Sequence, residues 1–185
     1  MMNADFKKDY YRMTGKKWNF IEGHFQLIFG HRLRFMKHFR KIQKRSKNLS
    51  YFYHRICMFH LSRKYGIEIH PSTKIGLGFA LFHPYNITIN PEAIIGNNVN
   101  ISKGATIGME CRGIRRGSPI IGNKVFIGIN ATIVGKISIG DDVLIAPNSY
   151  VNCDVPSHSI VIGNPCKIIS KENATHGYVN FLIED

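Results

Sequence analysis

Residues 120–151 read IIGNKVFIGINATIVGKISIGDDVLIAPNSYV, with an aliphatic residue at every sixth position. These positions are Ile121, Ile127, Ile133, Ile139, Ile145 and Val151. Upstream, the same spacing links Ile69, Ile75 and Leu81, and then Ile89, Ile95, Ile101 and Ile107. A period of six fits neither an amphipathic helix nor a strand with simple alternation. It is typical of a hexapeptide repeat, in which each hexad forms one short strand and one corner of a β-helix.

The repeat predicts how the chain buries its apolar residues. Three hexads make a triangular coil of about eighteen residues, and the inward aliphatic side chains stack from coil to coil. Gly or Ala follows most repeat positions, as in Ile121-Gly122, and we expect it to turn the corner without a Cβ clash. Hexapeptide coils wind left-handed, against the usual crossover rule. The predicted fold is therefore mainly β: a left-handed parallel β-helix.

Two irregularities interrupt the six-residue spacing. Leu81 and Ile89 are eight residues apart, so two extra residues lie within 81–88. Ile107 and Ile121 are fourteen apart, which predicts a loop within Met109–Pro119. Insertions in repeat folds form loops on one face, often the binding face. We therefore expect the chemistry of the protein at these two places.

Charge divides the chain of 185 residues near Gly66. Residues 1–66 hold 16 Lys/Arg and 3 Asp/Glu, whereas residues 67–185 hold nine of each. We predict a basic α-helical segment over 1–66, the β-helix over 67–170 and a tail over 171–185. The sequence has no apolar run near twenty residues and no signal-peptide pattern, and its four cysteines lack CxxC spacing. These features predict a cytoplasmic protein with reduced thiols.

Apolar residues at helical spacing predict two or three helices over residues 20–64, broken near Gly23, Gly30 and residues 47–50. These helices either cap the β-helix and pack on a neighbouring subunit, or contact an anionic membrane at its inner face. Nucleic acid binding is disfavoured because no groove-reading motif is present. His24, His31 and His38 are seven residues apart, roughly 10 Å along a helix. We therefore expect them on the helix surface, and we predict no metal site.

His83 is the candidate catalytic residue, because it lies in the first irregularity, before Pro84. The two extra residues would hold its imidazole out of the stack, where it can act as a general base. Glu68 precedes it by fifteen residues, slightly less than one coil. Its carboxylate is expected to orient the imidazole. The alternatives are an exposed loop histidine and a solvated surface carboxylate.

Three motifs occur in the order and spacing of a known family. They are Glu68-Ile69-His70-Pro71, Leu81-Phe82-His83 and Gly163-Asn164-Pro165-Cys166-Lys167. Residues 67–170 thereby resemble the hexapeptide-repeat acyltransferases, and within them the serine acetyltransferase-like branch. The resemblance implies that His83 is the catalytic base, that Glu68 replaces the orienting Asp of the family, and that acetyl-CoA is the cosubstrate.

The sequence departs from that branch at two acceptor-binding positions. Phe82 stands where the branch has an Asp before the catalytic His, and Ser118 where it has a second His. A buried ammonium without a carboxylate is penalised, which disfavours free serine. The loop with Arg112, Arg115, Arg116 and Gly117 instead resembles the branch that O-acetylates bacterial surface polysaccharides.

We therefore predict an acetyl-CoA-dependent O-acetyltransferase acting on a sugar hydroxyl of a surface polysaccharide or its lipid-linked precursor. The residues expected at the glycan acceptor are Phe82, Tyr85, Arg116 and Ser118. Three alternatives remain: a serine or other small-molecule O-acetyltransferase, an acetyltransferase for a sugar amine, and a non-enzymatic scaffold.

The resemblance also implies a homotrimer with the active site between neighbouring subunits and CoA along the groove. By position, the residues expected along the pantetheine arm are Gly108, Gly128, Ile129, Ala146 and Pro147. Lys167, with Arg115 or Arg116, is expected to bind the phosphates. The alternative for each glycine is a corner residue.

Overall fold

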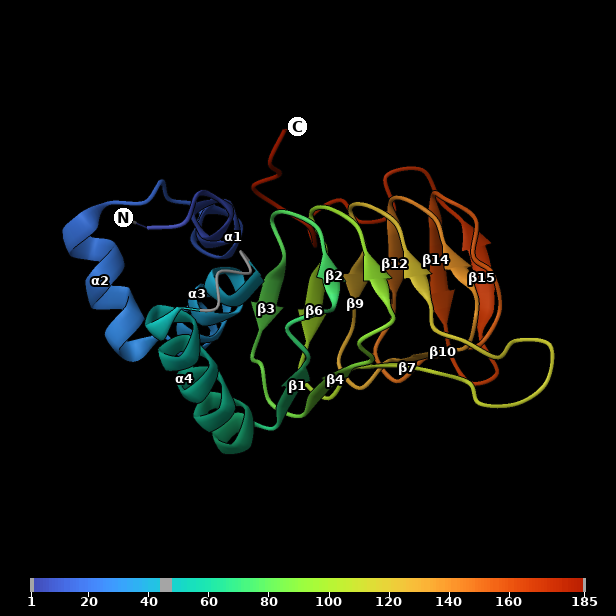
Figure 1. The fold of residues 1–185 in the computed structure, drawn as a ribbon. Coiled ribbons are helices and arrows are strands. Elements are labelled where there is room, and N and C mark those ends of the chain that lie inside the picture. The colour runs from blue at the N-terminus through green and yellow to red at the C-terminus, as the bar shows by residue number, and fades with distance from the viewer. Residues whose placement is uncertain (1, 44–47, 185) are drawn as a thin grey trace.

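Helices form one end of the molecule and short stacked strands form the rest (Figure 1). The computed structural model describes residues 2–43 and 48–184. The helices are α1 (Ala4–Thr14), α2 (Phe20–Phe29), α3 (His31–Gln43) and α4 (Leu49–Tyr65). The strands are β1 (Ile67–Ile69), β2 (Lys74–Ile75), β3 (Ala80–Phe82), β4 (Ile87–Ile89), β5 (Ile94–Ile95), β6 (Asn100–Ser102), β7 (Thr106–Gly108), β8 (Ile120–Ile121), β9 (Phe126–Ile127), β10 (Thr132–Val134), β11 (Ser138–Ile139), β12 (Val143–Ile145), β13 (Tyr150–Val151), β14 (Ser159–Ile162) and β15 (Lys167–Ser170).

The strands build three faces of a parallel β-helix. Face A stacks β1, β4, β7, β10 and β13; face B stacks β2, β5, β8 and β11; face C stacks β3, β6, β9, β12, β14 and β15. Pairing is parallel throughout except between β14 and β15, which are antiparallel. The β-helix predicted from the period of six is confirmed.

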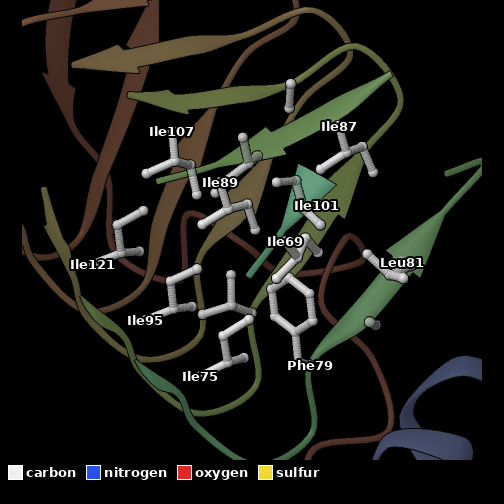
Figure 2. Packing of buried hydrophobic residues seen from close by; sticks show 14 of the residues in the cluster. Ile69, Ile75, Phe79, Leu81, Ile87, Ile89, Ile95, Ile101, Ile107 and Ile121 are labelled. Carbon is white, nitrogen blue, oxygen red and sulfur yellow. The ribbon is translucent and has the colours of Figure 1, made fainter. Parts of the chain in front are cut away.

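The repeat residues fill the inside of the β-helix. Ile89 pairs with Ile69 on one side and Ile107 on the other, and all three are at most 3% exposed. Figure 2 shows Ile75, Ile95 and Ile121 following one another from coil to coil in the same interior. This continuous column supplies the stability that a single coil lacks.

The glycine after a repeat residue makes room for the next coil, because a Cβ at this corner would clash with the backbone there. A Cβ on Gly96 would lie 2.6 Å from the carbonyl oxygen of Gly122, and one on Gly122 would lie 2.8 Å from the carbonyl carbon of Gly140. Several left-handed corner positions are asparagines, such as Asn130 and Asn148, with φ of 56° and 60°. Asn adopts this conformation more readily than most L-residues.

A first helix, α1, begins at Ala4, outside the 20–64 range in which helices were predicted, and Gly23, where a break was predicted, lies within α2. A Cβ on Gly23 would meet the Trp18 ring at 2.7 Å, so this glycine serves packing. Gly30 follows the end of α2, and α4 begins after Asn48, while residues 44–47 lie outside the described ranges.

The predicted surface position of His38 is wrong. Its side chain is 7% exposed, and its Nδ1 lies 2.7 Å from Nδ1 of His54. Burial, together with the nearby charge of His54, lowers the pKa of His38 to about 4. The His38 ring is therefore neutral at pH 7, and it packs between α3 and α4.

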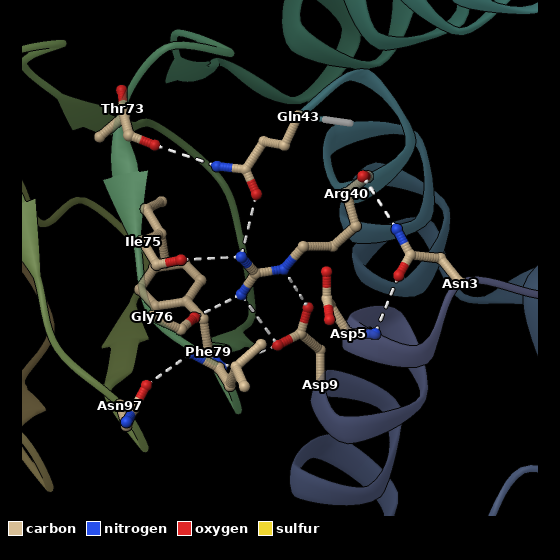
Figure 3. A network of polar contacts seen from close by, with 11 residues as sticks. Asn3, Asp5, Asp9, Arg40, Gln43, Thr73, Ile75, Gly76, Phe79 and Asn97 are labelled. Atoms are coloured by element: carbon tan, nitrogen blue, oxygen red, sulfur yellow. Dashed lines mark hydrogen bonds and ion pairs between the residues drawn. The ribbon is translucent and has the colours of Figure 1, made fainter. Parts of the chain in front are cut away.

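An ion pair on α1 and α3 caps the open end of the β-helix (Figure 3). The Arg40 guanidinium donates to the Asp9 carboxylate at 2.7 Å and to the carbonyls of Ile75 and Gly76. Asp9 in turn accepts from the Phe79 amide at 3.0 Å. These contacts satisfy backbone groups of the first coil that would otherwise form an unpaired edge.

The C-terminal tail returns along face C towards the helices (Figure 1). Its amides at Ala174 and Thr175 donate to the Asp142 carboxylate. Further along, the Tyr178 ring packs 4.9 Å from Phe126, and Ile183 exchanges hydrogen bonds with the Asn98 side chain. The tail therefore spans several coils.

Replacing Asp142 with alanine is expected to release this tail. The Thr175 hydroxyl, which donates to Asp142 at 2.6 Å, would lose its acceptor together with the two amides. Each buried group left unsatisfied costs about 1–3 kcal/mol. Hydrogen exchange at residues 171–184 should rise, and exchange in Asp154→Ala should not, because Asp154 accepts only an exposed hydrogen bond from Ser138.

Acid should release the tail of the unaltered protein in the same way. Burial alone would raise the pKa of Asp142, but hydrogen bonds from Thr175 and His158 lower it to about 2. A carboxyl group with a depressed folded-state pKa stabilises the structure above its unfolded pKa, and this stability is lost as the pH falls. Amide protection factors in the tail, which correct for the pH dependence of intrinsic exchange, should therefore fall between pH 4 and 2. Unchanged protection factors over this range would contradict the role of Asp142.

Candidate active site

His83 lies on an exposed corner between faces C and A. Strand β3 ends at Phe82 and β4 begins at Ile87, so the two extra residues are contained in residues 83–86. His83 has a φ of 47°, and its carbonyl accepts from the Tyr85 amide at 2.8 Å. The Tyr85 carbonyl accepts from Gly104 of the next coil at 2.9 Å. Backbone hydrogen bonds thus fix the corner, and within the described residues the imidazole makes no hydrogen bond or ion pair.

Glu68 lies on the outer side of face A, one coil from the strand that follows His83. It pairs in register with Thr88, whose hydroxyl donates to its carboxylate at 3.5 Å. Within the described residues no hydrogen bond or ion pair joins Glu68 to His83. The orienting contact therefore stays a prediction.

A groove of about 510 Å³ runs between α4 and face A. Its residues include Arg55 and Phe59 of α4, and Glu68, Thr88 and Asn90 of the β-helix. The lining residues of β4 begin at Thr88, and His83 is not among the residues that line the groove.

Both predicted acceptor-contacting aromatic rings have partners inside the chain. The Arg32 guanidinium lies 5.8 Å from the centre of the Phe82 ring. The Tyr85 ring lies 5.5 Å from Tyr65 and 5.2 Å from His31. These contacts hold α3 and α4 against the first coil and give both rings a packing role.

The predicted loop runs from Met109 to Pro119 between β7 and β8 and extends from the β-helix at the lower right of Figure 1. Glu110 and Gly117 exchange backbone hydrogen bonds of 3.0 and 2.9 Å across its base. Arg115 donates to the carbonyl of Asn152. Ser118 donates to the Asn90 side chain at 3.0 Å, at the margin of the groove that contains Glu68. Arg116 is exposed.

The predicted site residues fall on two edges of the β-helix. The C–A edge, where the chain passes from face C to face A, carries His83, Gly128, Ile129, Ala146 and Pro147, and the 163–166 turn that precedes Lys167. The A–B edge carries the loop with Arg115, Arg116 and Ser118, and Gly108 lies at its start. Within one chain the structure therefore separates Gly108 and the arginines from His83.

Two corners of the C–A edge stack directly. The Gly128 amide donates to the Ile145 carbonyl at 2.9 Å, and the Asn148 amide donates to the Ile129 carbonyl at 2.9 Å. A Cβ on Gly128 would lie 2.6 Å from the Pro147 nitrogen. The close stacking of these two corners therefore requires a glycine at position 128, which supports its corner role.

Residues 2–43 and 48–184 contain no group of three or more His, Cys, Asp or Glu side chains placed to hold a metal ion. None of the helices in these ranges is long and apolar enough to cross a membrane.

Comparison with known proteins supports the repeat. Residues 118–153 match the family described as Bacterial transferase hexapeptide (six repeats). Over these residues the chain is similar to the hexapeptide-repeat transferases.

Several proteins similar to this chain are serine acetyltransferases. Serine acetyltransferase 2 of Arabidopsis thaliana is 43% identical over 109 residues, which are 59% of this chain and 34% of that protein. The serine acetyltransferase of Neisseria gonorrhoeae in complex with serine is 30% identical, with a TM-score of 0.69, over 90% of this chain and 66% of that one. A serine acetyltransferase in complex with CoA is 26% identical, with a TM-score of 0.65, over 77% and 59%. The chain spans about a third of the length of the curated relative.

The prediction of a polysaccharide O-acetyltransferase is therefore wrong, since the relatives support the serine acetyltransferase alternative. That prediction rested on Phe82 and Ser118, where acceptor-binding groups are missing. In the structure Phe82 packs beneath Arg32, and Ser118 bonds to Asn90. The side chains at these two positions are accounted for by contacts within the chain. They therefore do not identify a sugar acceptor.

Proposed function

We propose that this chain transfers the acetyl group of acetyl-CoA to the hydroxyl of L-serine. The observation that carries the proposal is the C–A edge, which places His83 in line with Gly128, Ile129, Ala146 and Pro147. The matched serine acetyltransferases support both the acetyl donor and the acceptor.

In this proposal His83 is the general base. It takes the serine hydroxyl proton while the oxygen attacks the thioester carbonyl, and the resulting imidazolium returns the proton to the departing CoA thiolate. Glu68 acts as a positioning residue whose negative charge stabilises the imidazolium. His83 is exposed, as a group that contacts the substrate must be.

The C–A edge is also the proposed path of CoA. The corners at 83–86 and 146–149 are three coils apart, roughly 14 Å at the usual strand spacing. An extended pantetheine arm lying along this edge would bring the thioester to His83. Lys167, at the far end of the same edge, would meet the phosphates.

The division of the site between two edges favours an oligomer. We propose a trimer in which the loop of one subunit, with Arg115, Arg116 and Ser118, faces the C–A edge of its neighbour. Gly108, at the start of the loop, would then also approach the cosubstrate from the neighbouring chain.

Release of CoA thiol from acetyl-CoA, with and without L-serine, tests the function. We expect serine-dependent release and formation of O-acetylserine by mass spectrometry, and none with glycine, which lacks the hydroxyl. If calorimetry showed CoA binding but L-serine were not acetylated, L-serine would be ruled out as the acceptor. Acetyl-CoA would remain the proposed donor.

We also propose that α2 and α4 contact an anionic membrane surface. Their outer sides carry bare apolar residues, with Phe20, Ile21 and Leu49 exposed by 74%, 81% and 87%. The adjoining residues 31–65 hold eleven Lys/Arg and no Asp/Glu. This charge repels a second copy of the same surface and attracts anionic lipid.

Vesicle sedimentation should therefore show binding to phosphatidylglycerol and much weaker binding to phosphatidylcholine. Phe52→Ser with Ile56→Ser, both on the outer side of α4, should reduce binding several-fold. Ile114→Ser, at the 99% exposed loop position, is the matched control and should bind normally. Self-association through α4 without vesicle binding would contradict the proposal.

A further inference from the structure

Two thiols meet near the C-terminal end of the β-helix. Cys153 follows β13, and Cys166 ends the turn between β14 and β15. Their sulfur atoms are 3.8 Å apart, both side chains are half-buried, and neither is in a disulfide. A disulfide bond is about 2.05 Å long, so the sulfurs would have to approach by somewhat less than 2 Å.

Each cysteine adjoins, in the chain, either a proposed phosphate-binding residue or the residue that anchors one. Lys167 directly follows Cys166, and Asn152 directly precedes Cys153. The Asn152 carbonyl accepts the hydrogen bond from Arg115 that holds the loop to the β-helix. A movement of either sulfur is therefore transmitted to Lys167 or to the anchor of Arg115.

We propose that Cys153 and Cys166 are a redox modification site that forms a reversible intramolecular disulfide by exchange with a small disulfide such as oxidised glutathione, and that this bond weakens acetyl-CoA binding. One thiolate attacks oxidised glutathione and releases a first glutathione thiolate. The second cysteine then attacks the mixed disulfide and releases a second one. The two cysteines lose two electrons and two protons, and the oxidised glutathione gains them.

The surroundings of Cys153 set the rate of this exchange. Burial, followed by the Cys166 thiol, raises the pKa of Cys153, and Arg115 acts in the opposite direction. Because the thiolate is the nucleophile, exchange should accelerate as the pH rises above 7. Cys111 lies exposed in the loop and serves as an internal reference for an unpaired thiol.

The formation of the bond is tested on the full chain in buffers of reduced and oxidised glutathione, with peptide mapping by mass spectrometry. We expect a Cys153–Cys166 disulfide in the unaltered protein and in Cys111→Ser, and none in Cys153→Ser or Cys166→Ser. Thiols that stay reduced at every glutathione ratio, or cysteines that pair otherwise, would overturn the site.

The effect on the cosubstrate rests on the proposed function and has its own readout. Calorimetry should give a Kd for CoA that is several-fold higher in the oxidised protein, reversed by dithiothreitol and unaffected in Cys153→Ser. An unchanged Kd would overturn the effect on binding. Absence of serine turnover in the reduced protein would refute the proposed function alone, because peptide mapping and CoA binding do not depend on it.

Discussion

Replacing His83 with alanine is expected to lower serine-dependent acetyl transfer by about 10²- to 10⁴-fold, the usual contribution of a general base. The loss should appear mainly in kcat, because the proposed base acts on the proton that moves in the transition state. The melting temperature should stay unchanged, since the side chain is exposed and makes no hydrogen bond within the described residues. CoA thiol release and thermal melting measure the two effects.

The matched control is His176→Ala, an exposed histidine in the tail, which should keep full activity. Glu68→Gln separates positioning from catalysis. It should lower kcat and change the pH profile while leaving KM for acetyl-CoA unchanged. If His83→Ala acetylated L-serine at the rate of the unaltered protein, His83 would not be the general base.

Replacing Arg40 with methionine is expected to destabilise the fold by about 3–5 kcal/mol, because it leaves the Asp9 carboxylate buried and unpaired. Arg40 is 2% exposed and Asp9 is 0% exposed. The carbonyls of Ile75 and Gly76 would lose a donor in the same variant. For a chain of this length the melting temperature should fall by roughly 6–20 °C.

Two further variants make this result specific. Lys16→Met breaks an ion pair with Glu22 in which both side chains are exposed, and it should not change the melting temperature measurably. The double variant Asp9→Leu with Arg40→Met removes both buried charges and should recover part of the loss. An Arg40→Met protein that melts like the unaltered chain would show that the capping ion pair contributes little.

The period of six was enough to predict the β-helix and its loop, because each repeat can be recognised within a short stretch of sequence. The same spacing located the corner at His83. The capping contact between Asp9 and Arg40 was not predicted, since it joins residues 31 positions apart that share no pattern. The contact between Thr175 and Asp142 could not be predicted from the sequence for the same reason.

The candidate site was predicted only in part. The six-residue repeat by itself assigns Gly108 and Gly128 to different edges of the β-helix. The resemblance to the family, which matches residues one position at a time, does not show this division. The predicted sugar acceptor was wrong because the absence of an acidic side chain at Phe82 does not identify the ligand. The position before His83 instead packs against Arg32, and no local signal predicts that contact.

A stack of repeats usually behaves as a one-dimensional array, in which each unit senses only its neighbours and the ends fray first. The tail changes this connectivity, because it touches Asp142 and Phe126 on late coils, Asn98 on an early one and Tyr11 of α1. The last coil therefore cannot unfold until the contacts that the tail makes near the first coil have broken. The array should therefore unfold in a single cooperative transition, and a chain cut before residue 171 should lose that cooperativity and open progressively from its C-terminal end.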